Sequence, residues 1–261
     1  MAQVIVTRPA QDAQRWVREL SAQGLQAIAL PLIAITPAAN ALPVQQAWQY
    51  MANYQAAMFV SGNAVSHFYA SNWPLAHDRN AQTAINIRAW ATGPGTVAAL
   101  HQAGVAATQI DAPDAAAGQF DSEALWHIVA PQVQPGSRIL LVRGSDHTGE
   151  AAGRSWLAEQ LTAAGAQLDT VVAYERRMPE FSPDQLHQAQ QACRDGSVWL
   201  FSSSEAIAHL QTLLPGQDFR ASRAVATHGR IAQAARSAGF GVVCESRPLL
   251  ADIVASIESL A

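Results

Sequence analysis

Four short segments of this sequence combine hydroxyl, amide and glycine residues at positions that favour anion binding. They are Ser61-Gly62-Asn63, Thr92-Gly93-Pro94-Gly95-Thr96, Ser202-Ser203-Ser204 and Thr227-His228-Gly229. Each follows a short apolar run and precedes an amphipathic segment, which predicts that each lies at the N-terminus of a helix. Backbone N–H groups are free there, and small side chains let an anion come close. N-capping alone is the competing interpretation, because Ser, Thr and Asn are also the preferred caps.

Three arginines, one histidine and one tyrosine add groups that could bind or protonate a ligand. Arg8 and Arg143 both end apolar runs, and Arg230 opens an expected helix. A guanidinium binds a carboxylate through two parallel hydrogen bonds, although each of these arginines could instead form a surface ion pair. His228 either acts as a general acid or base or caps its helix. Tyr174 lies in an extended segment, where its hydroxyl either faces a ligand or packs.

The charged residues exclude several classes of function. The chain has 261 residues, with 16 cationic and 20 acidic side chains and a net charge of −4, and every cation is an arginine. The absence of lysine excludes Schiff-base chemistry and a Walker-type phosphate loop. A mildly acidic chain without a basic run also predicts no nucleic-acid partner.

The cysteines and histidines predict neither a disulfide nor a metal site. Cys193 and Cys244 form no CxxC pair, and the eight histidines include no HxH, HExxH or HxxxH spacing. We therefore expect free thiols, a cytoplasmic protein, and no metal or other cofactor. The longest strongly apolar stretch, Ile28–Ile35, is far shorter than the roughly 18–20 residues that span a bilayer, so no membrane partner is expected.

One glycine motif leaves a nucleotide-dependent enzyme open as an alternative. Residues Gly93 to Ala98 match the G-x-G-x-x-A dinucleotide fingerprint, and Asp111 or Asp114 lies near the expected position of the ribose-binding acid. However, Pro94 stiffens the turn, and the related segment at residues 228–230 lacks the pattern.

The elements that must position these residues alternate between short apolar runs and longer amphipathic segments. Strands are expected at Val4–Val6, Gln26–Ile35, Ala56–Ser61, Arg88–Thr92, Arg138–Arg143, Val171–Arg177 and Ser197–Phe201. Helical spacing between them predicts an α/β fold with parallel sheets.

The chain also resembles itself at a constant spacing. Arg8 and Arg143 lie 135 residues apart, as do the segments that begin at Ala91 and Ala226, each of which ends 13 residues later at a glycine. The segment 59–65 resembles 200–207 in the same order. These matches predict two homologous α/β halves.

Two extended segments, near 33–37 and 172–178, are expected to run side by side as a two-stranded β linker between two lobes. Domain one would then be discontinuous, with residues 1–36 plus 177–261, and domain two would be the inserted 37–176. A cleft between the lobes is the expected place for a ligand.

Taken in order, the motifs resemble those of the uroporphyrinogen-III synthase family. They are Val6–Pro9, Pro31–Ile33, Phe59–Val65, Gly93–Thr96, Arg143-Gly144, Gly153-Arg154 with Gly165-Ala166, and Tyr174. The resemblance covers essentially the whole chain. Two features depart from the family pattern. Residues 145–152 separate the Arg-Gly and Gly-Arg pairs, and residues 228–231 stand where many members have Gly-x-Thr-Thr.

The resemblance implies two α/β lobes and a lyase that needs no cofactor or metal and acts as a monomer. Its substrate would be hydroxymethylbilane, a linear tetrapyrrole with eight carboxylates. Loss of the terminal hydroxyl as water would give an azafulvene, and closure through a spiro intermediate would invert ring D. Tyr174 would assist departure of the hydroxide. The expected substrate-binding residues are Arg8, Ser61, Asn63, Thr92, Gly93, Gly95, Thr96, Arg143, Gly144, Ser202, Ser203, Ser204, His228, Gly229 and Arg230. A catalytically degenerate two-lobed binding or regulatory protein for an acidic small molecule is the alternative.

Overall fold

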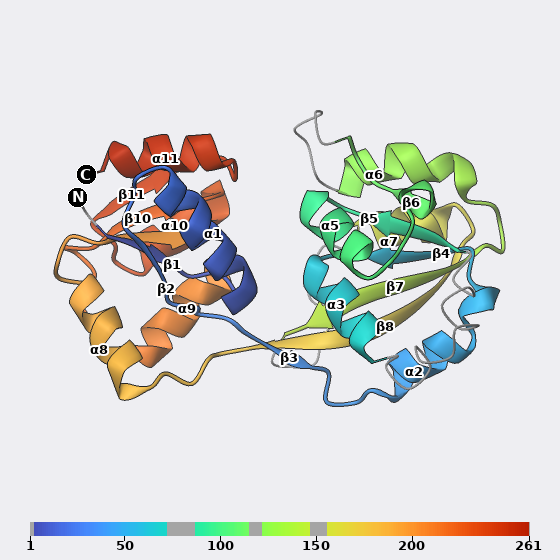
Figure 1. Cartoon of the computed structure of the whole chain (residues 1–261), viewed down its shortest axis with the longest axis horizontal. Coiled ribbons are helices and arrows are strands. Elements are labelled where there is room, and N and C mark those ends of the chain that lie inside the picture. The colour runs from blue at the N-terminus through green and yellow to red at the C-terminus, as the bar shows by residue number, and fades with distance from the viewer. Residues whose placement is uncertain (1–2, 72–86, 115–121, 147–155, 261) are drawn as a thin grey trace. The chain divides into compact units, whose positions relative to one another are not determined.

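The computed structural model describes residues 3–71, 87–114, 122–146 and 156–260 (Figure 1). The chain divides into two compact units, each built on its own sheet. Unit 1 consists of Met1–Ala34 and Arg177–Ala261, and unit 2 consists of Ile35–Arg176. Among the described helices, none is both long enough and apolar enough to cross a membrane.

Unit 1 contains a five-stranded sheet in the order β11-β10-β9-β1-β2, in which every neighbouring pair is parallel. Its strands are β1 (Val4–Val6), β2 (Ala27–Ala29), β9 (Val198–Phe201), β10 (Arg223–Ala226) and β11 (Val242–Glu245). Its helices are α1 (Ala10–Ala22), α8 (Pro183–Ala192), α9 (Ser204–Leu213), α10 (Gly229–Ser237) and α11 (Leu250–Glu258). The central strands are continuous apolar runs because both faces of a parallel sheet are covered.

Both faces of the unit 1 sheet carry packed side chains. Residues of α1 and α11, including Trp16 and Ile253, pack with Val4 and Leu200 on one face. Trp199 alternates with Leu200 along β9, so its side chain lies on the opposite face. There the ring stacks on Phe201, with centroids 6.0 Å apart, and its indole N–H donates to a carbonyl at the end of α8. Packed side chains on both faces of the sheet therefore fix the positions of its central strands.

Unit 2 contains a six-stranded sheet in the order β3-β8-β7-β4-β5-β6. Its strands are β3 (Ala34–Pro37), β4 (Ala56–Phe59), β5 (Arg88–Ala91), β6 (Ile110–Asp111), β7 (Arg138–Ser145) and β8 (Gln167–Arg177). Its α-helices are α2 (Leu42–Gln49), α3 (Gly62–Ala70), α5 (Pro94–Gln102), α6 (Ser122–Val129) and α7 (Trp156–Ala163), and its 3-10 turns are η1 (Met51–Asn53), η2 (Ala107–Gln109) and η4 (Ala130–Gln132). The pairs β4–β5, β4–β7, β5–β6 and β7–β8 are parallel.

The helices of unit 2 cover two faces of its sheet. On one face, α2, α3 and α5 pack through residues such as Trp48 and Phe68 against Phe59 and Val142. On the other face, residues of α6 and α7 pack with Trp90 and its neighbours. This arrangement leaves the carboxyl ends of the parallel strands along one edge, where the loops to α3 and α5 begin.

The two sheets share one strand order, which supports the internal repeat. Read along each sheet, β11-β10-β9-β1-β2 of unit 1 corresponds to β6-β5-β4-β7-β8 of unit 2. Helices α5 and α10 are each followed by a glycine in the left-handed region, Gly104 with φ 87° and Gly239 with φ 96°. A side chain with a Cβ is strained at such a backbone angle, so glycine ends both helices.

The expected single strand over Gln26–Ile35 is wrong. The segment instead contains β2 and the first two residues of β3, and these strands belong to different sheets. Pro31 has no N–H with which to hydrogen-bond a neighbouring strand. The sequence between β2 and β3 is nevertheless apolar, because Leu30 and Leu32 are fully buried although they belong to no strand. Within unit 2, β3 is the outermost strand of the sheet and lies next to β8.

Candidate active site

Unit 2 brings five of the expected site residues to the carboxyl edge of its sheet. Ser61 follows β4, Thr92 follows β5, and Arg143 and Gly144 lie near the end of β7. Tyr174 lies in β8 directly opposite Gly144. Ligands of open α/β sheets bind at this edge, so the arrangement defines a candidate site within one unit.

The turns after β4 and β5 touch each other. The Oγ of Ser61 accepts a hydrogen bond of 3.1 Å from the N–H of Ala64 and so caps α3. A Cβ placed on Gly62 would lie 3.3 Å from the carbonyl oxygen of Gly95 in the first turn of α5. Two helix N-termini therefore meet at this edge, and both favour negative charge nearby.

The remaining expected residues of these turns have different environments. Thr96 is buried in α5, whereas Asn63 is half-buried in the first turn of α3. Gly93 is the N-cap of α5 and supplies no capping side chain. Thr92 donates a 3.4 Å hydrogen bond to the carbonyl of Val60. Both interpretations of the turns therefore stand, since the Ser61 side chain caps α3 but no side chain caps α5.

Tyr174 lies against the turn after β4 and is only 5% exposed. Its hydroxyl is 3.1 Å from the Oγ of Ser61, and either oxygen can be the donor. Its ring stacks on the imidazole of His67 in α3, with centroids 5.8 Å apart. Burial lowers the pKa of His67, which favours the neutral ring beside the phenol. His67 carried no sequence signal, because its position in α3 places it against a strand far along the chain.

Arg143 is a buried guanidinium at the same edge. The residue is 8% exposed, and its Nε has no hydrogen-bond partner among the residues that the structure describes. Burial lowers its pKa, Tyr174 raises it, and the nearby Arg176 lowers it. A buried N–H donor without an acceptor is costly, so an anionic ligand that accepts from Nε would stabilise this guanidinium.

Unit 1 presents a similar set of residues after β1, β9 and β10. Arg8 follows β1, and its Cζ lies 4.8 Å from the centroid of the Trp16 ring. Burial lowers the pKa of Arg8, and its Nε also has no hydrogen-bond partner within the described parts of the chain. Ser203 caps α9 by accepting from the N–H of Glu205 at 3.2 Å, and Ser202 and Ser204 flank it half-buried.

His228 serves as a helix cap. Its Nδ1 accepts a 3.1 Å hydrogen bond from the N–H of Arg230, so the proton of the neutral ring lies on Nε2. A Cβ on Gly229 would lie 3.2 Å from a carboxylate oxygen of Glu245, at the end of β11. This carboxylate lies at the α10 N-terminus and opposes a second anion there. Sequence reasoning missed Glu245, because it reaches the turn from another strand.

The structure gives no support to the dinucleotide alternative. Asp111, one candidate for the ribose acid, accepts a 2.8 Å hydrogen bond from the Nε of Arg88 and forms an ion pair with it. Arg88 begins β5, at the end of the strand opposite to the Gly93 turn. Asp114 also has an interaction of its own. Asp111 is therefore engaged by a residue at the end of β5 opposite to the Gly93 turn.

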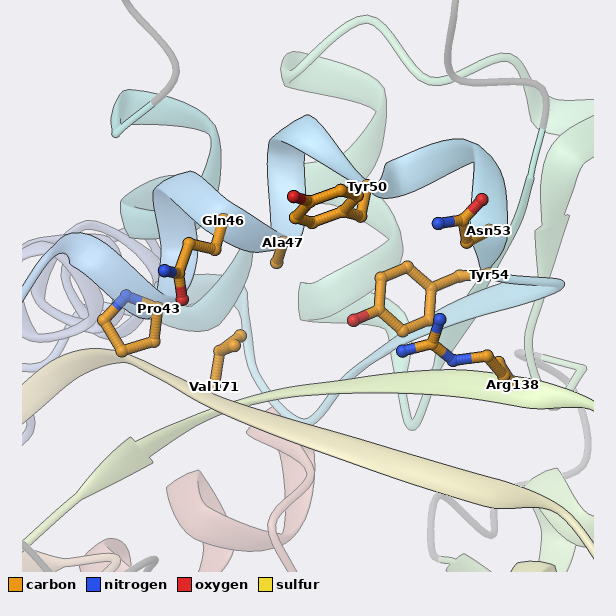
Figure 2. Close-up of a pocket in the computed structure, with 8 residues that line it drawn as sticks. All are labelled: Pro43, Gln46, Ala47, Tyr50, Asn53, Tyr54, Arg138 and Val171. Atoms are coloured by element: carbon orange, nitrogen blue, oxygen red, sulfur yellow. The ribbon is translucent and has the colours of Figure 1, made fainter.

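A separate pocket of about 550 Å³ lies between the α2–η1 segment and strands β7 and β8 (Figure 2). It is lined by Pro43, Gln46, Ala47, Tyr50, Asn53, Tyr54, Arg138 and Val171. Arg138 begins β7, five residues before Arg143, which corresponds to about 17 Å along a strand. The pocket is therefore not part of the carboxyl edge.

Two polar side chains of this pocket, Tyr54 and Arg138, share one carboxylate partner. Tyr54 donates a 2.8 Å hydrogen bond to Asp169, and Arg138 forms an ion pair with the same carboxylate. The guanidinium also lies over the Tyr54 ring, with its Cζ 5.1 Å from the centroid. These contacts with Tyr54 and Arg138 lower the pKa of Asp169, and burial together with Asp169 raises the pKa of Tyr54 to about 12.

We predict a stability effect of Asp169→Asn that disappears in acid. Because folding lowers the pKa of Asp169, its contribution is present above the ordinary aspartate pKa of about 3.9 and is lost as pH falls through the lowered value. The carboxylate is 44% exposed, so we expect a loss of about 0.5–1 kcal/mol near pH 7. Urea unfolding of both proteins from pH 7 to pH 2 measures this difference, and a difference independent of pH would contradict it.

Part of the family pattern lies outside the described residues. Gly153-Arg154 and positions 147–152 of the longer loop belong to this part of the chain, so their contribution to the edge is not placed. Gly165-Ala166 follows α7 and leads into β8.

Comparisons with known proteins identify the family. The sequence model of the family described as uroporphyrinogen-III synthase HemD matches residues 14–255. A uroporphyrinogen-III synthase from Synechococcus elongatus is 28% identical over 215 residues, which cover 81% of this chain and 74% of that protein.

Solved structures share the fold. Uroporphyrinogen-III synthetase from Helicobacter pylori aligns over all of both chains, with a TM-score of 0.60 and 16% identity. A mutant uroporphyrinogen III synthase from Thermus thermophilus aligns over 100% of this chain and 98% of that one, with a TM-score of 0.53 and 15% identity.

These matches identify a cyclising lyase of tetrapyrrole biosynthesis, and the parallel α/β sheets agree with the fold of its solved relatives. The chain belongs to the uroporphyrinogen-III synthase family, as its motifs indicated. The family match favours the enzyme over the alternative of a degenerate binding protein.

Proposed function

We propose that this chain converts hydroxymethylbilane into uroporphyrinogen III and that the hydroxyl group leaves beside Tyr174. The observation that carries this proposal is the buried phenol, 3.1 Å from Ser61, at an edge where two helix N-termini meet. A phenol at such a place can donate a hydrogen bond or a proton to a departing hydroxide.

The phenol of Tyr174 can account for every proton that the overall reaction moves. The leaving hydroxide takes a proton and departs as water, and the azafulvene that remains is attacked by the substituted carbon of ring D. After the spiro intermediate opens, closure at the other α-carbon of ring D releases one proton. Tyr174 can therefore give a proton in the first step and regain one in the last, so neither an oxidant nor a reductant is needed.

We propose that binding geometry does most of the catalytic work. The free substrate closes without help, but to the wrong isomer, so the enzyme must hold ring D where the substituted carbon attacks first. Substrate carboxylates would be held by Arg143, by the Ser61-Gly62-Asn63 turn and by the Thr92–Thr96 turn. Buried Arg143 and the α5 N-terminus, where no side chain accepts a capping hydrogen bond, support this assignment.

We extend the proposal to unit 1 and rank its two candidate carboxylate-binding segments by expected strength. Arg8 and the Ser202–Ser204 turn would bind further substrate carboxylates, supported by the partly desolvated Arg8 guanidinium. The His228-Gly229-Arg230 turn would bind more weakly, because the Glu245 carboxylate already lies beside it. The sequence analysis placed both turns among the substrate-binding segments and noted only that residues 228–231 depart from the family pattern.

We also propose a monomer that works in the cytoplasm. Both described cysteines are free, and burial raises the pKa of Cys193 to about 11, which keeps this thiol protonated and unreactive. Sedimentation equilibrium of the purified chain tests the monomer.

The reaction itself is tested with freshly prepared hydroxymethylbilane and purified protein. The products are oxidised to porphyrins, and the type I and type III isomers are separated by chromatography. We expect type III to dominate without any added cofactor. Type I alone, formed at the rate of a control without protein, would overturn the proposal.

A further inference from the structure

The strand that carries Tyr174 has an irregularity next to this residue. Along β7 and β8, Arg143 pairs with Val172, but the next residue, Gly144, pairs with Tyr174. Ala173 is therefore an extra residue in β8, as in a β-bulge. Bulges redirect the side chains that follow them and occur frequently beside active sites. Here the bulge places the Tyr174 ring opposite a residue that has no side chain.

Gly144 leaves the space that the ring occupies. A Cβ on this glycine would lie 2.4, 2.6 and 2.9 Å from Cζ, Cε2 and Cε1 of Tyr174. Real Cβ atoms do not approach other heavy atoms this closely, so any other residue would displace the ring. Gly144 does not have a left-handed φ, so the backbone conformation does not require glycine. The ring explains why a glycine is needed.

Ser61 and His67 also contact Tyr174. The Oγ of Ser61 accepts from the N–H of Ala64 and lies 3.1 Å from the phenol oxygen. If Ser61 donates its own proton to that oxygen, the phenol proton stays free for a ligand. The imidazole of His67 stacks on the same ring. The hydroxyl of Tyr174 is thus fixed by contacts from β7 and α3.

We infer that Gly144 and Ser61 are positioning residues that fix the direction of the Tyr174 hydroxyl. This inference rests on the proposed role of Tyr174 in the reaction. It changes the expected role of Gly144, which acts through the ring instead of through close approach of a substrate carboxylate. Misplacement of a reacting group by about 1 Å can cost up to a hundredfold in rate, so a displaced ring should be readily measured.

The first test is a mutant cycle with Gly144→Ala and Tyr174→Phe. We expect Gly144→Ala to lower kcat at least roughly fivefold in the wild-type background, with a smaller effect on KM. In the Tyr174→Phe background the added methyl group still strains the ring, so it still lowers the melting temperature, but it should not lower kcat further. A merely structural role would instead lower kcat by the same factor in both backgrounds and would overturn the inference.

The second test uses Ser61 and does not depend on whether Gly144→Ala folds. Ser61→Ala should lower kcat, whereas Ser61→Thr keeps the hydroxyl and should restore most of it. The matched control is Ser182→Ala, because Ser182 also caps a helix through its Oγ, but that helix is α8 of unit 1. Each cap is worth about 1 kcal/mol, so both alanine variants should lose similar stability while only Ser61→Ala loses turnover. Equal kcat for Ser61→Ala and Ser182→Ala would contradict the role of Ser61.

The outcomes separate the inference from the function on which it rests. If Tyr174→Phe keeps full kcat, the role of Tyr174 is wrong and the positioning role falls with it. If Tyr174→Phe loses activity while Gly144→Ala and Ser61→Ala do not, the proposed function stands and the inference is wrong.

Discussion

Tyr174→Phe is expected to lower kcat on hydroxymethylbilane by about tenfold or more while the protein stays folded. The substitution removes only the hydroxyl, and the phenyl ring can still lie on Gly144 and against His67. Ser61 keeps its hydrogen bond from Ala64, so no buried acceptor loses its only partner. The measurement is the initial rate of type III isomer formation, corrected for spontaneous closure to type I.

Tyr54→Phe is the matched control for this prediction. Tyr54 is also a buried tyrosine of unit 2, and its hydroxyl donates to Asp169 at the opposite end of the sheet. The same atom is therefore removed far from the carboxyl edge. We expect a small loss of stability and an unchanged kcat. Full turnover by Tyr174→Phe would remove the phenol from the reaction, and an equal loss in both variants would indicate a general effect on the fold.

Much of the fold was predictable because local sequence and global packing agree. Central parallel strands need apolar residues on both faces, and Val4–Val6 and Val198–Phe201 supply them without interruption. Helix ends were marked by glycines such as Gly104 and Gly239, whose left-handed φ is a local requirement. The internal repeat then related the two sheets, because equivalent strands are followed by similar residues.

The sequence-based predictions were wrong or incomplete where contacts between residues far apart in the chain determine the structure. The apolar run Gln26–Ile35 looks like one strand, but only pairing partners in two different sheets reveal where it breaks. The extra residue at Ala173 has no signal of its own, because a bulge is a property of two paired strands. For the same reason, the sequence could place Gly144 at a strand end but could not show the ring above it. The residue types thus predicted that ligands bind at the carboxyl ends of the strands. The roles proposed for Gly144 and Ser61 depend on the three-dimensional structure.

Arg143→Met is expected to make the protein more stable and a poorer enzyme. The guanidinium is buried, its Nε has no partner among the described residues, and Arg176 adds repulsion. Methionine keeps much of the apolar stem and removes the desolvated charge, so the free energy of unfolding should rise by about 1 kcal/mol. Loss of a charged hydrogen bond to a substrate carboxylate is worth about 1.5–3 kcal/mol, so kcat/KM should fall roughly 10- to 100-fold.

Arg138→Met provides a control with the opposite sign. Arg138 begins the same strand, but it forms an ion pair with Asp169 and lies over the Tyr54 ring. The same substitution there removes a partner from a carboxylate, so it should lower stability and leave kcat/KM unchanged. Urea unfolding and initial rates on both variants measure the two quantities independently.

The pair of variants distinguishes a binding residue from a structural one. If Arg143→Met lost stability as Arg138→Met does, the guanidinium would already have a partner in the free protein, and its role would be structural. If kcat/KM stayed unchanged, Arg143 would not contact the substrate. We expect Arg143→Met to gain stability and to lose kcat/KM. This combination is typical of a buried cation that binds an anionic substrate, because the cation destabilises the free protein and the bound substrate offsets that destabilisation.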